Sequence, residues 1–318
     1  MNDKDIAEVN VLIVSSTIDY STDLVCCELE RRGCSYLRIN RDLFWKYNIV
    51  YDIDGQTMNF QIEGKKYIVN NDSLKSIYFR APVFFRYSNK LALNEQLYRS
   101  QWGAFIRNLI VFDKAKWINH PVATYRAENK MLQLQMAKSV GMRIPKTYIG
   151  NHLPSVIKDN NNYIVKALEA PIFYDEEEEM FTYSTVLTGK YLMNSNLKDA
   201  PVILQEYLTP KIDYRVTVVN NRIFPTIIQL GDFGIEGDWR KHSKTELSYI
   251  PTQLPNELGI KLHLLMDALG LTFGGIDLAL CGDEFYFIEV NPTGEWGWLV
   301  KTAGHEIHKA IADYLEAI

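Results

Sequence analysis

The chain has 318 residues, of which 47% are hydrophobic and 23% charged, the proportions of an ordinary globular protein. Its net charge of −5 lacks the positive field that nucleic acid or an anionic membrane attracts, so we expect neither partner. No run approaches the roughly 18 apolar residues of a membrane helix. The charged first residues also lack a signal sequence, which predicts a cytoplasmic protein. The four cysteines lack metal-finger spacing, and reduced thiols fit that compartment.

The first part of the chain predicts an open α/β domain, because an apolar strand is followed by a capped helix and a second strand. The predicted elements are a strand at 9–15, a helix capped by Asp19 or Ser21 that ends at Gly33, a strand at 36–40, antiparallel strands within 50–70, a strand at 76–79 and a helix at 91–113. A boundary follows Trp117-Ile118, since the residue before Pro121 disfavours helical angles.

The rest of the chain predicts two further domains. The predicted elements are a helix at 122–140, strands at 146–149 and 163–168, a strand at 201–208, a strand pair at 213–219 and 222–230, a helix at 256–269, a hairpin of strands at 273–280 and 285–290, and a helix at 305–317. Five consecutive acids at 175–179 predict a solvated, mobile loop. We expect domains at 1–118, 119–204 and 205–318.

The late hairpin carries acids within apolar strands. A turn at Gly282-Asp283 brings Asp277 within about one position of Glu289 across the strands. Asn291 lies two residues after Glu289, so its side chain points to the same side of the strand. The alternative is that both acids face solvent. Charges in apolar strands need a partner, however, and an all-oxygen site suits Mg²⁺ or Mn²⁺ rather than zinc. The sequence therefore favours a divalent metal site.

Two lysines are candidate phosphate ligands. Lys166 lies within an apolar strand, where its ammonium needs an anion unless the strand is at a sheet edge and the side chain reaches water. Lys130 lies inside the predicted helix 122–140, where a solvated face is the alternative. Together with a magnesium site, the two lysines fit a nucleoside triphosphate between domains. Neither a P-loop, a strand-linked Gly-x-Gly-x-x-Gly nor a Gly-x-Ser-x-Gly elbow is found.

The order of these motifs resembles the ATP-grasp ligases. The motifs are Asn129-Lys130, Lys166, Gln205-Glu206-Tyr207-Leu208, Asp213-x-Arg215, Ile276-Asp277-Leu278 and FIEVNPTGE at 287–295. The chain is most similar to the peptide maturases of the microviridin or graspetide type, and the ligases that add glutamate to a ribosomal protein are more distant. The implied fold is α/β (α+β), with an N-terminal pre-ATP-grasp domain, a small central domain, a C-terminal antiparallel sheet, and ATP between the last two.

The resemblance implies a role for each motif. Asp277, Glu289 and Asn291 are implied to bind two Mg²⁺ ions, or Mn²⁺, that bridge the ATP phosphates. Lys130 and Lys166 are implied to contact the phosphates, and Asp213 the ribose. The hinge is implied to hold adenine through backbone groups, and consists of Gln205, Glu206, Tyr207 and Leu208. The Glu206 side chain can equally accept from the adenine amino group, and a plain linker strand is the alternative for this segment.

Four arginines remain. Arg215 lies on the same strand face as Asp213 and, by the resemblance, stabilises a charged acyl-phosphate. Arg240 follows Gly237-Asp238-Trp239 in a loop expected near the γ-phosphate, with a structural or solvated role as the alternative. Arg80 and Arg86 can meet an acidic peptide, but we expect them to be solvated.

The implied reaction activates Asp or Glu side chains of a ribosomally made precursor peptide, with a leader and an acidic core, as acyl-phosphates. Thr, Ser or Lys side chains of the same peptide then close ester or amide macrocycles. The alternatives are a ligase of free amino acids or of a protein terminus, and a catalytically silent ATP-binding scaffold. Many ATP-grasp proteins have a glycine-rich phosphate lid where this chain has acids at 175–179. Similar maturases also suggest a homodimer.

Overall fold

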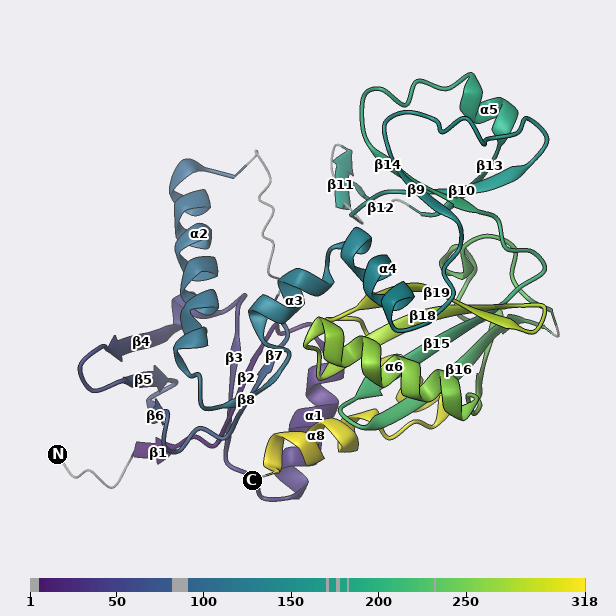
Figure 1. The fold of residues 1–318 in the computed structure, drawn as a ribbon. Helices are drawn as coiled ribbons and strands as arrows, with labels where there is room; N and C mark the ends of the chain where they lie inside the picture. The colour runs from purple at the N-terminus through teal and green to yellow at the C-terminus, as the bar shows by residue number, and fades with distance from the viewer. Residues whose placement is uncertain are drawn as a thin grey trace.

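The computed structural model describes residues 6–81, 91–169, 172–175, 178–181, 183–231 and 233–317. Figure 1 shows an N-terminal region in purple and blue, a small teal sheet, and a green and yellow C-terminal sheet. Within the described residues, no helix is long and apolar enough to cross a membrane. Arg86 lies outside these residues.

A four-stranded parallel sheet forms the centre of the N-terminal region. Its order is β3-β2-β7-β8, with strands β2 (Val11–Ser15), β3 (Tyr36–Asn40), β7 (Ser76–Phe79) and β8 (Lys116–Ile118). Every residue of β2 is buried, as expected for a strand covered on both faces. Helix α1 (Tyr20–Arg31) begins at Asp19, whose Oδ1 accepts from the Thr22 amide at 3.1 Å. The predicted α/β start is therefore confirmed.

A second sheet and a helix pack beside it. The sheet has the order β1-β6-β5-β4, with strands β1 (Ile6–Glu8), β4 (Tyr47–Asp52), β5 (Thr57–Ile62) and β6 (Lys65–Asn70). The short 3-10 helix η2 (Phe44–Lys46) precedes β4. The helix predicted at 91–113 is α2 (Leu93–Arg107), which continues as the 3-10 helix η3 (Asn108–Val111). One apolar core joins both sheets and contains Phe44, Phe60, Phe79 and Trp117.

The single helix expected at 122–140 is wrong. The chain forms α3 (Pro121–Ala127) and α4 (Lys130–Ser139) instead. The break occurs because Asn129 has extended angles, and its side-chain amide donates to the Tyr125 carbonyl at 2.7 Å and the Arg126 carbonyl at 3.3 Å. Lys130 is therefore the first residue of a helix and not an interior one.

The central sheet has the order β13-β10-β14-β9. Its strands are β9 (Thr147–Gly150), β10 (Asn162–Lys166), β13 (Thr185–Thr188) and β14 (Val202–Glu206). A small core under helix α5 (Gly189–Met193) contains Ile157, Leu192 and Leu204. The expected acidic loop is wrong in part, because β11 (Ile172–Asp175) pairs antiparallel with β12 (Glu178–Phe181). Backbone pairing thus takes Asp175, Glu178 and Glu179 into strands.

The C-terminal sheet is antiparallel, with the order β17-β16-β15-β18-β19. The strands are β15 (Ile212–Val219), β16 (Arg222–Leu230), β17 (Leu247–Pro251), β18 (Phe273–Cys281) and β19 (Glu284–Asn291). Helix α6 (Asn256–Leu269) buries Leu258, Leu262, Leu265 and Leu269 against one face, as predicted. Strand side chains alternate between faces, so Tyr214 and Val216 join this core while Asp213 and Arg215 lie on the opposite face.

Helices α3 and α4 share this C-terminal core through Ala127, Leu134 and Ala137. The final helix expected at 305–317 is α8 (Ile307–Glu316), and α7 (Gly297–Ala303), which the sequence did not predict, precedes it. Figure 1 shows α8 beside α1, and Arg32, directly after α1, pairs with Asp313 of α8 at 2.7 Å. The end of the chain thus packs on its beginning. The domain limits at 118 and 204 stay a prediction.

Asn119, which follows β8, connects the N-terminal and C-terminal regions. It is buried, and its Nδ2 donates to the carbonyls of Phe273 and Pro292, each at 2.8 Å. Its Oδ1 accepts from the amides of Thr272 at 2.8 Å and Phe273 at 2.9 Å. One side chain therefore fixes both the start of β18 and the loop after β19.

Asn119→Ala is expected to destabilise the protein by about 3 kcal/mol, because buried backbone groups that lose a partner cost roughly 1–3 kcal/mol each. Denaturant unfolding measures the change. Asn48→Ala, on the exposed side of β4, is the control and should alter stability by no more than roughly 0.5 kcal/mol. Equal effects of the two variants would contradict the role given to Asn119.

Candidate active site

Asp277 and Glu289 lie directly opposite each other on β18 and β19. The predicted closeness is confirmed. The turn alone would place Asp277 opposite Ile288, and a register shift between Asp277 and Leu278 brings it opposite Glu289 instead. Asn291 lies on the same side as Glu289, and its Nδ2 is 3.5 Å from Glu289 Oε1. Asp277 is buried and Glu289 is nearly so. Two carboxylates this close require compensating positive charge.

Cations from three different elements supply that charge. Arg240, on the 3-10 helix η4 (Trp239–Lys241), places Nη2 2.6 Å from Asp277 Oδ2 and 3.0 Å from Glu289 Oε1. Arg215 of β15 donates from Nη1 to Asp277 Oδ1 at 2.9 Å. Lys130 at the start of α4 pairs with Glu289 Oε2. Burial raises the pKa of Glu289, but Lys130, Arg240 and Lys166 outweigh it and hold the pKa well below its ordinary value.

The donor set fits a divalent cation. Because one nitrogen of Arg240 contacts both carboxylates, oxygens of Asp277 and Glu289 face a common point. The Asn291 amide now turns its nitrogen toward Glu289. With the amide rotated so that its oxygen faces the carboxylates, the three side chains would form an all-oxygen set of the kind that binds Mg²⁺. Among the described residues, no three His, Cys, Asp or Glu side chains gather as a metal cluster. Further ligands must then come from a phosphate or water, and Arg240 must withdraw before a metal takes its position.

A cavity lies between the central and C-terminal sheets, beside the carboxylates. Its walls include every predicted hinge and ribose residue, namely Gln205, Glu206, Tyr207, Leu208 and Asp213, together with Lys166, Asp277 and Glu289. The structure therefore brings these residues together, and their roles stay a prediction. Lys130 and Asn291 line a wider adjoining cleft, and Lys166, Arg240 and Glu289 border both spaces.

The hinge groups already have partners of their own. Gln205 is buried and donates from Nε2 to Thr147 Oγ1 at 2.9 Å. The Glu206 amide donates to the Lys146 carbonyl at 3.0 Å, so this N–H is not free to bind a base. Asp213 pairs with Lys211, a cavity residue that the sequence did not single out. Burial raises the pKa of Asp213, and the Lys211 charge opposes that shift.

Lys166 ends strand β10 in the wall between the two spaces. Burial lowers the pKa of its ammonium from 10.5 to about 8, although the nearby charge of Glu289 acts in the opposite direction. A buried ammonium close to its pKa gains from an anionic ligand, since the ligand stabilises the charged form. The position therefore suits a phosphate contact.

Two glycines, Gly275 and Gly294, leave a space for the Arg215 guanidinium, which we call the Arg215 slot. A Cβ added at Gly294 would lie 2.5 Å from Arg215 Nη2, and one at Gly275 would lie closer still. Arg215 Nη2 also approaches the Glu295 carbonyl at 3.4 Å, whereas its buried Nε has no hydrogen-bond partner among the described residues. A buried donor without an acceptor is costly, so an anion in the cleft would satisfy it.

Comparison with known proteins decides the family. The sequence model of the RimK-like ATP-grasp domain matches residues 127–315, more than half of the chain. The chain belongs to the RimK-like ATP-grasp family. A curated relative, tetrahydromethanopterin:alpha-L-glutamate ligase of Methanocaldococcus jannaschii, is 26% identical over 219 residues, which cover 64% of this chain and 72% of the relative.

Solved structures share the fold of this ATP-grasp ligase over nearly its whole length. A Chryseobacterium gregarium RiPP-associated ATP-grasp ligase, in complex with ADP and a leader and core peptide, has a TM-score of 0.84 at 24% identity and covers 97% of this chain and 96% of its own. Macrocyclase MdnC of Microcystis aeruginosa, bound with precursor peptide MdnA, has a TM-score of 0.78 at 26% identity and covers 96% and 98%. The predicted ATP-grasp fold is confirmed.

Filling the Arg215 slot is expected to lower the activity of this ATP-grasp ligase. Gly294→Ala should lower the rate of ADP release by about 100-fold, because displacing a reacting group by about 1 Å can cost that much. Gly259→Ala is the control, since its added Cβ meets only Ile223 Cδ1 at 3.6 Å, an ordinary contact. A coupled ADP assay and a thermal melt measure both variants. Normal turnover in folded Gly294→Ala would contradict the claim that Arg215 needs the space beside Gly294.

Proposed function

We propose that this ATP-grasp ligase activates Asp or Glu side chains of a ribosomally made precursor peptide as acyl-phosphates and closes ω-ester or ω-amide macrocycles. The observation that carries the proposal is the meeting of two spaces at Glu289, Arg240 and Lys166. The residues that line the first suit a nucleotide, and the second is the wider cleft, which suits a peptide segment. Homologues bound to leader and core peptides support the same substrate class.

In the nucleotide cavity we assign adenine to the hinge Gln205–Leu208 and the ribose to Asp213. The occupied Glu206 amide leaves other backbone groups of the hinge for the base. Lys166 and Lys130 then contact the phosphates, and Asp277, Glu289 and Asn291 hold Mg²⁺, two ions in our proposal, beside them. Bound Mg²⁺ would neutralise phosphate charge as the γ-phosphoryl group is transferred. ADP in one solved neighbour, and ADP with Mg in another, support these ligands.

The chain contributes position and charge to two successive steps. A peptide carboxylate oxygen attacks the γ-phosphorus, the bond to the β-phosphate oxygen breaks, and ADP leaves. A Thr or Ser hydroxyl, or a Lys amine, then attacks the acyl carbon, loses its proton and displaces phosphate. Arg215 binds Asp277, and Arg240, once a metal takes its position between Asp277 and Glu289, would turn toward the transferring phosphoryl group. We therefore assign both arginines the stabilisation of the negative charge in the two transition states. No nucleophile of the enzyme is needed.

A second candidate is a ligase that adds an amino acid such as glutamate to a small molecule or protein terminus. The curated relative, an alpha-L-glutamate ligase, supports it. The peptide maturase is favoured by a solved structure, macrocyclase MdnC bound with its precursor peptide, which has a TM-score of 0.78 at 26% identity over 96% of this chain.

Co-expression with an acidic, Thr- and Lys-containing precursor peptide is the direct test. Mass spectrometry should find the loss of one water per ring from the peptide with the wild-type enzyme, and no loss with Asp277→Asn, which removes a carboxylate from the metal site. ADP release with free glutamate and small amines, without any modified peptide, would favour the second candidate. An equally active Asp277→Asn enzyme would refute the metal assignment.

Lys166 gives the affinity for ATP a pH dependence. Its ammonium is charged below about pH 8 and loses its proton above it, so ATP binding should be constant near pH 7 and weaken above pH 8, by up to about tenfold per unit. Lys166→Arg keeps the charge and should show no such fall. Calorimetric titrations at pH 7, 8 and 9 compare the two enzymes with the same nucleotide, and parallel profiles would contradict the phosphate role of Lys166.

A further inference from the structure

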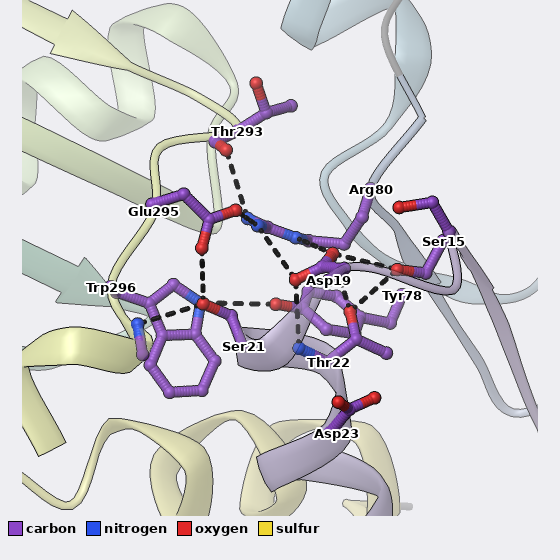
Figure 2. Close-up of polar contacts among 12 residues, drawn as sticks. Ser15, Asp19, Ser21, Thr22, Asp23, Tyr78, Arg80, Thr293, Glu295 and Trp296 are labelled. Carbon is purple, nitrogen blue, oxygen red and sulfur yellow. Dashed lines mark hydrogen bonds and ion pairs between the residues drawn. The ribbon is translucent and has the colours of Figure 1, made fainter.

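Arg80 lies in the N-terminal region, far in sequence from the site, yet its side chain is bound to the loop that follows β19. We expected Arg80 to be solvated, and that is wrong: its side chain is only 4% exposed. Nε donates to Asp19 Oδ2 at 3.0 Å, and Nη1 donates to the carbonyls of Thr293 at 3.1 Å and Gly294 at 3.2 Å. Nη2 binds the Glu295 carboxylate, and Figure 2 shows the guanidinium between Asp19 and Glu295.

The same loop has two further attachments to the N-terminal region. Ser21 donates to Glu295 Oε2 at 2.7 Å and accepts from the Gly297 amide at 2.9 Å. Trp296 is fully buried, and its indole nitrogen lies 3.3 Å from the Tyr78 hydroxyl (Figure 2). Residues 293–297, which we call the anchored loop, are therefore held by α1, by β7 and by Arg80.

The ion pair between Asp19 and Arg80 stays charged near neutral pH. Burial raises the pKa of Asp19, but the neighbouring Arg80 guanidinium outweighs it and lowers the pKa to about 2. The Asp19 carboxylate therefore does not titrate near neutral pH. This makes the arrangement a fixed support rather than a pH switch.

The anchored loop is also one wall of the Arg215 slot. Gly294, whose carbonyl accepts from Arg80, leaves the space that Arg215 Nη2 occupies. The Glu295 carbonyl lies 3.4 Å from that nitrogen, and Arg215 in turn binds Asp277 at 2.9 Å. A displacement of the Gly294 backbone is thus transmitted directly to the guanidinium beside the two carboxylates.

We infer that Arg80 is a positioning residue, which holds the anchored loop from the N-terminal region and thereby fixes Arg215 for the transfer step. Five acceptor atoms on Asp19, Thr293, Gly294 and Glu295 set the orientation of its planar guanidinium, which a single ammonium cannot match. The step from the loop to turnover rests on the proposed function, whereas the hold on the loop does not.

Arg38 is the matched control. It too extends from the parallel sheet to the first turn of α1, donating to Asp23 at 2.5 Å, to the Ser16 carbonyl at 2.6 Å and to Asn40 at 2.9 Å. None of these partners belongs to the anchored loop. Replacing either arginine removes an ion-paired cation from the same region, with 17% of the Arg38 side chain and 4% of the Arg80 side chain exposed, but only Arg80 contacts the anchored loop.

The test combines steady-state kinetics with hydrogen exchange on the full-length enzyme. Arg80→Met should lower kcat for ADP release with the acidic precursor peptide by about 10- to 100-fold, with KM for ATP within about twofold of wild type. Exchange in residues 293–297 should accelerate. Arg38→Met should leave both readouts unchanged even if its melting temperature falls. Where Arg80→Met does not fold, Arg80→Lys replaces it and should recover only part of the rate.

A double-variant cycle separates positioning from general stability. Arg80→Met should add almost nothing to the loss caused by Arg215→Lys, because both act through the same guanidinium. The inference would be overturned if the double variant lost the product of the two single losses, or if Arg80→Met had the same kcat as Arg38→Met. If the wild-type enzyme accepts no peptide, the proposed function fails, and hydrogen exchange alone tests whether Arg80 holds the anchored loop. Unchanged exchange at 293–297 in Arg80→Met would then refute that role of Arg80.

Discussion

The facing carboxylates of Asp277 and Glu289 are the constraint on which the rest of the site depends. Two acids opposed across a strand pair and removed from water are tolerated only with positive charge between or beside them. Three separate elements supply it, since Arg215 comes from β15, Arg240 from η4 and Lys130 from the start of α4. The same charge balance that stabilises the fold therefore also gathers the groups that we propose bind and transfer a phosphoryl group.

The site depends on all three regions of the chain. The central sheet contributes Lys166 and the hinge, and the C-terminal sheet contributes the carboxylates and Arg215. The N-terminal region holds the far side of the site through Asn119 and Arg80, which bind the loop after β19. Buried amide and guanidinium groups suit this task, because each satisfies several backbone groups at fixed geometry.

Local sequence predicts the centre of the site well and its surroundings poorly. The short turn predicts Asp277 to within one position of Glu289, but their direct opposition depends on a register shift between Asp277 and Leu278 that the sequence does not signal. The side of Asn291 follows from the two-residue repeat of a strand. The place of Arg240 between the acids could not be predicted, because its segment has no periodic pattern. The burial of Arg80 depends on carbonyls more than 200 residues away. Likewise, the need for glycine at 275 and 294 could not be predicted, because it arises from the Arg215 side chain that packs against both positions in the fold.

Titration of the enzyme with Mn²⁺ in the presence of ADP, followed by electron paramagnetic resonance, tests the central claim most directly. Glu289→Gln should weaken Mn²⁺ binding by at least about tenfold, as expected for loss of a ligand when even outer-shell changes can cost that much. Asp283→Asn, an exposed acid in the turn of the same hairpin, should bind as the wild type does. Equal Mn²⁺ affinity in Glu289→Gln and wild type would contradict the account.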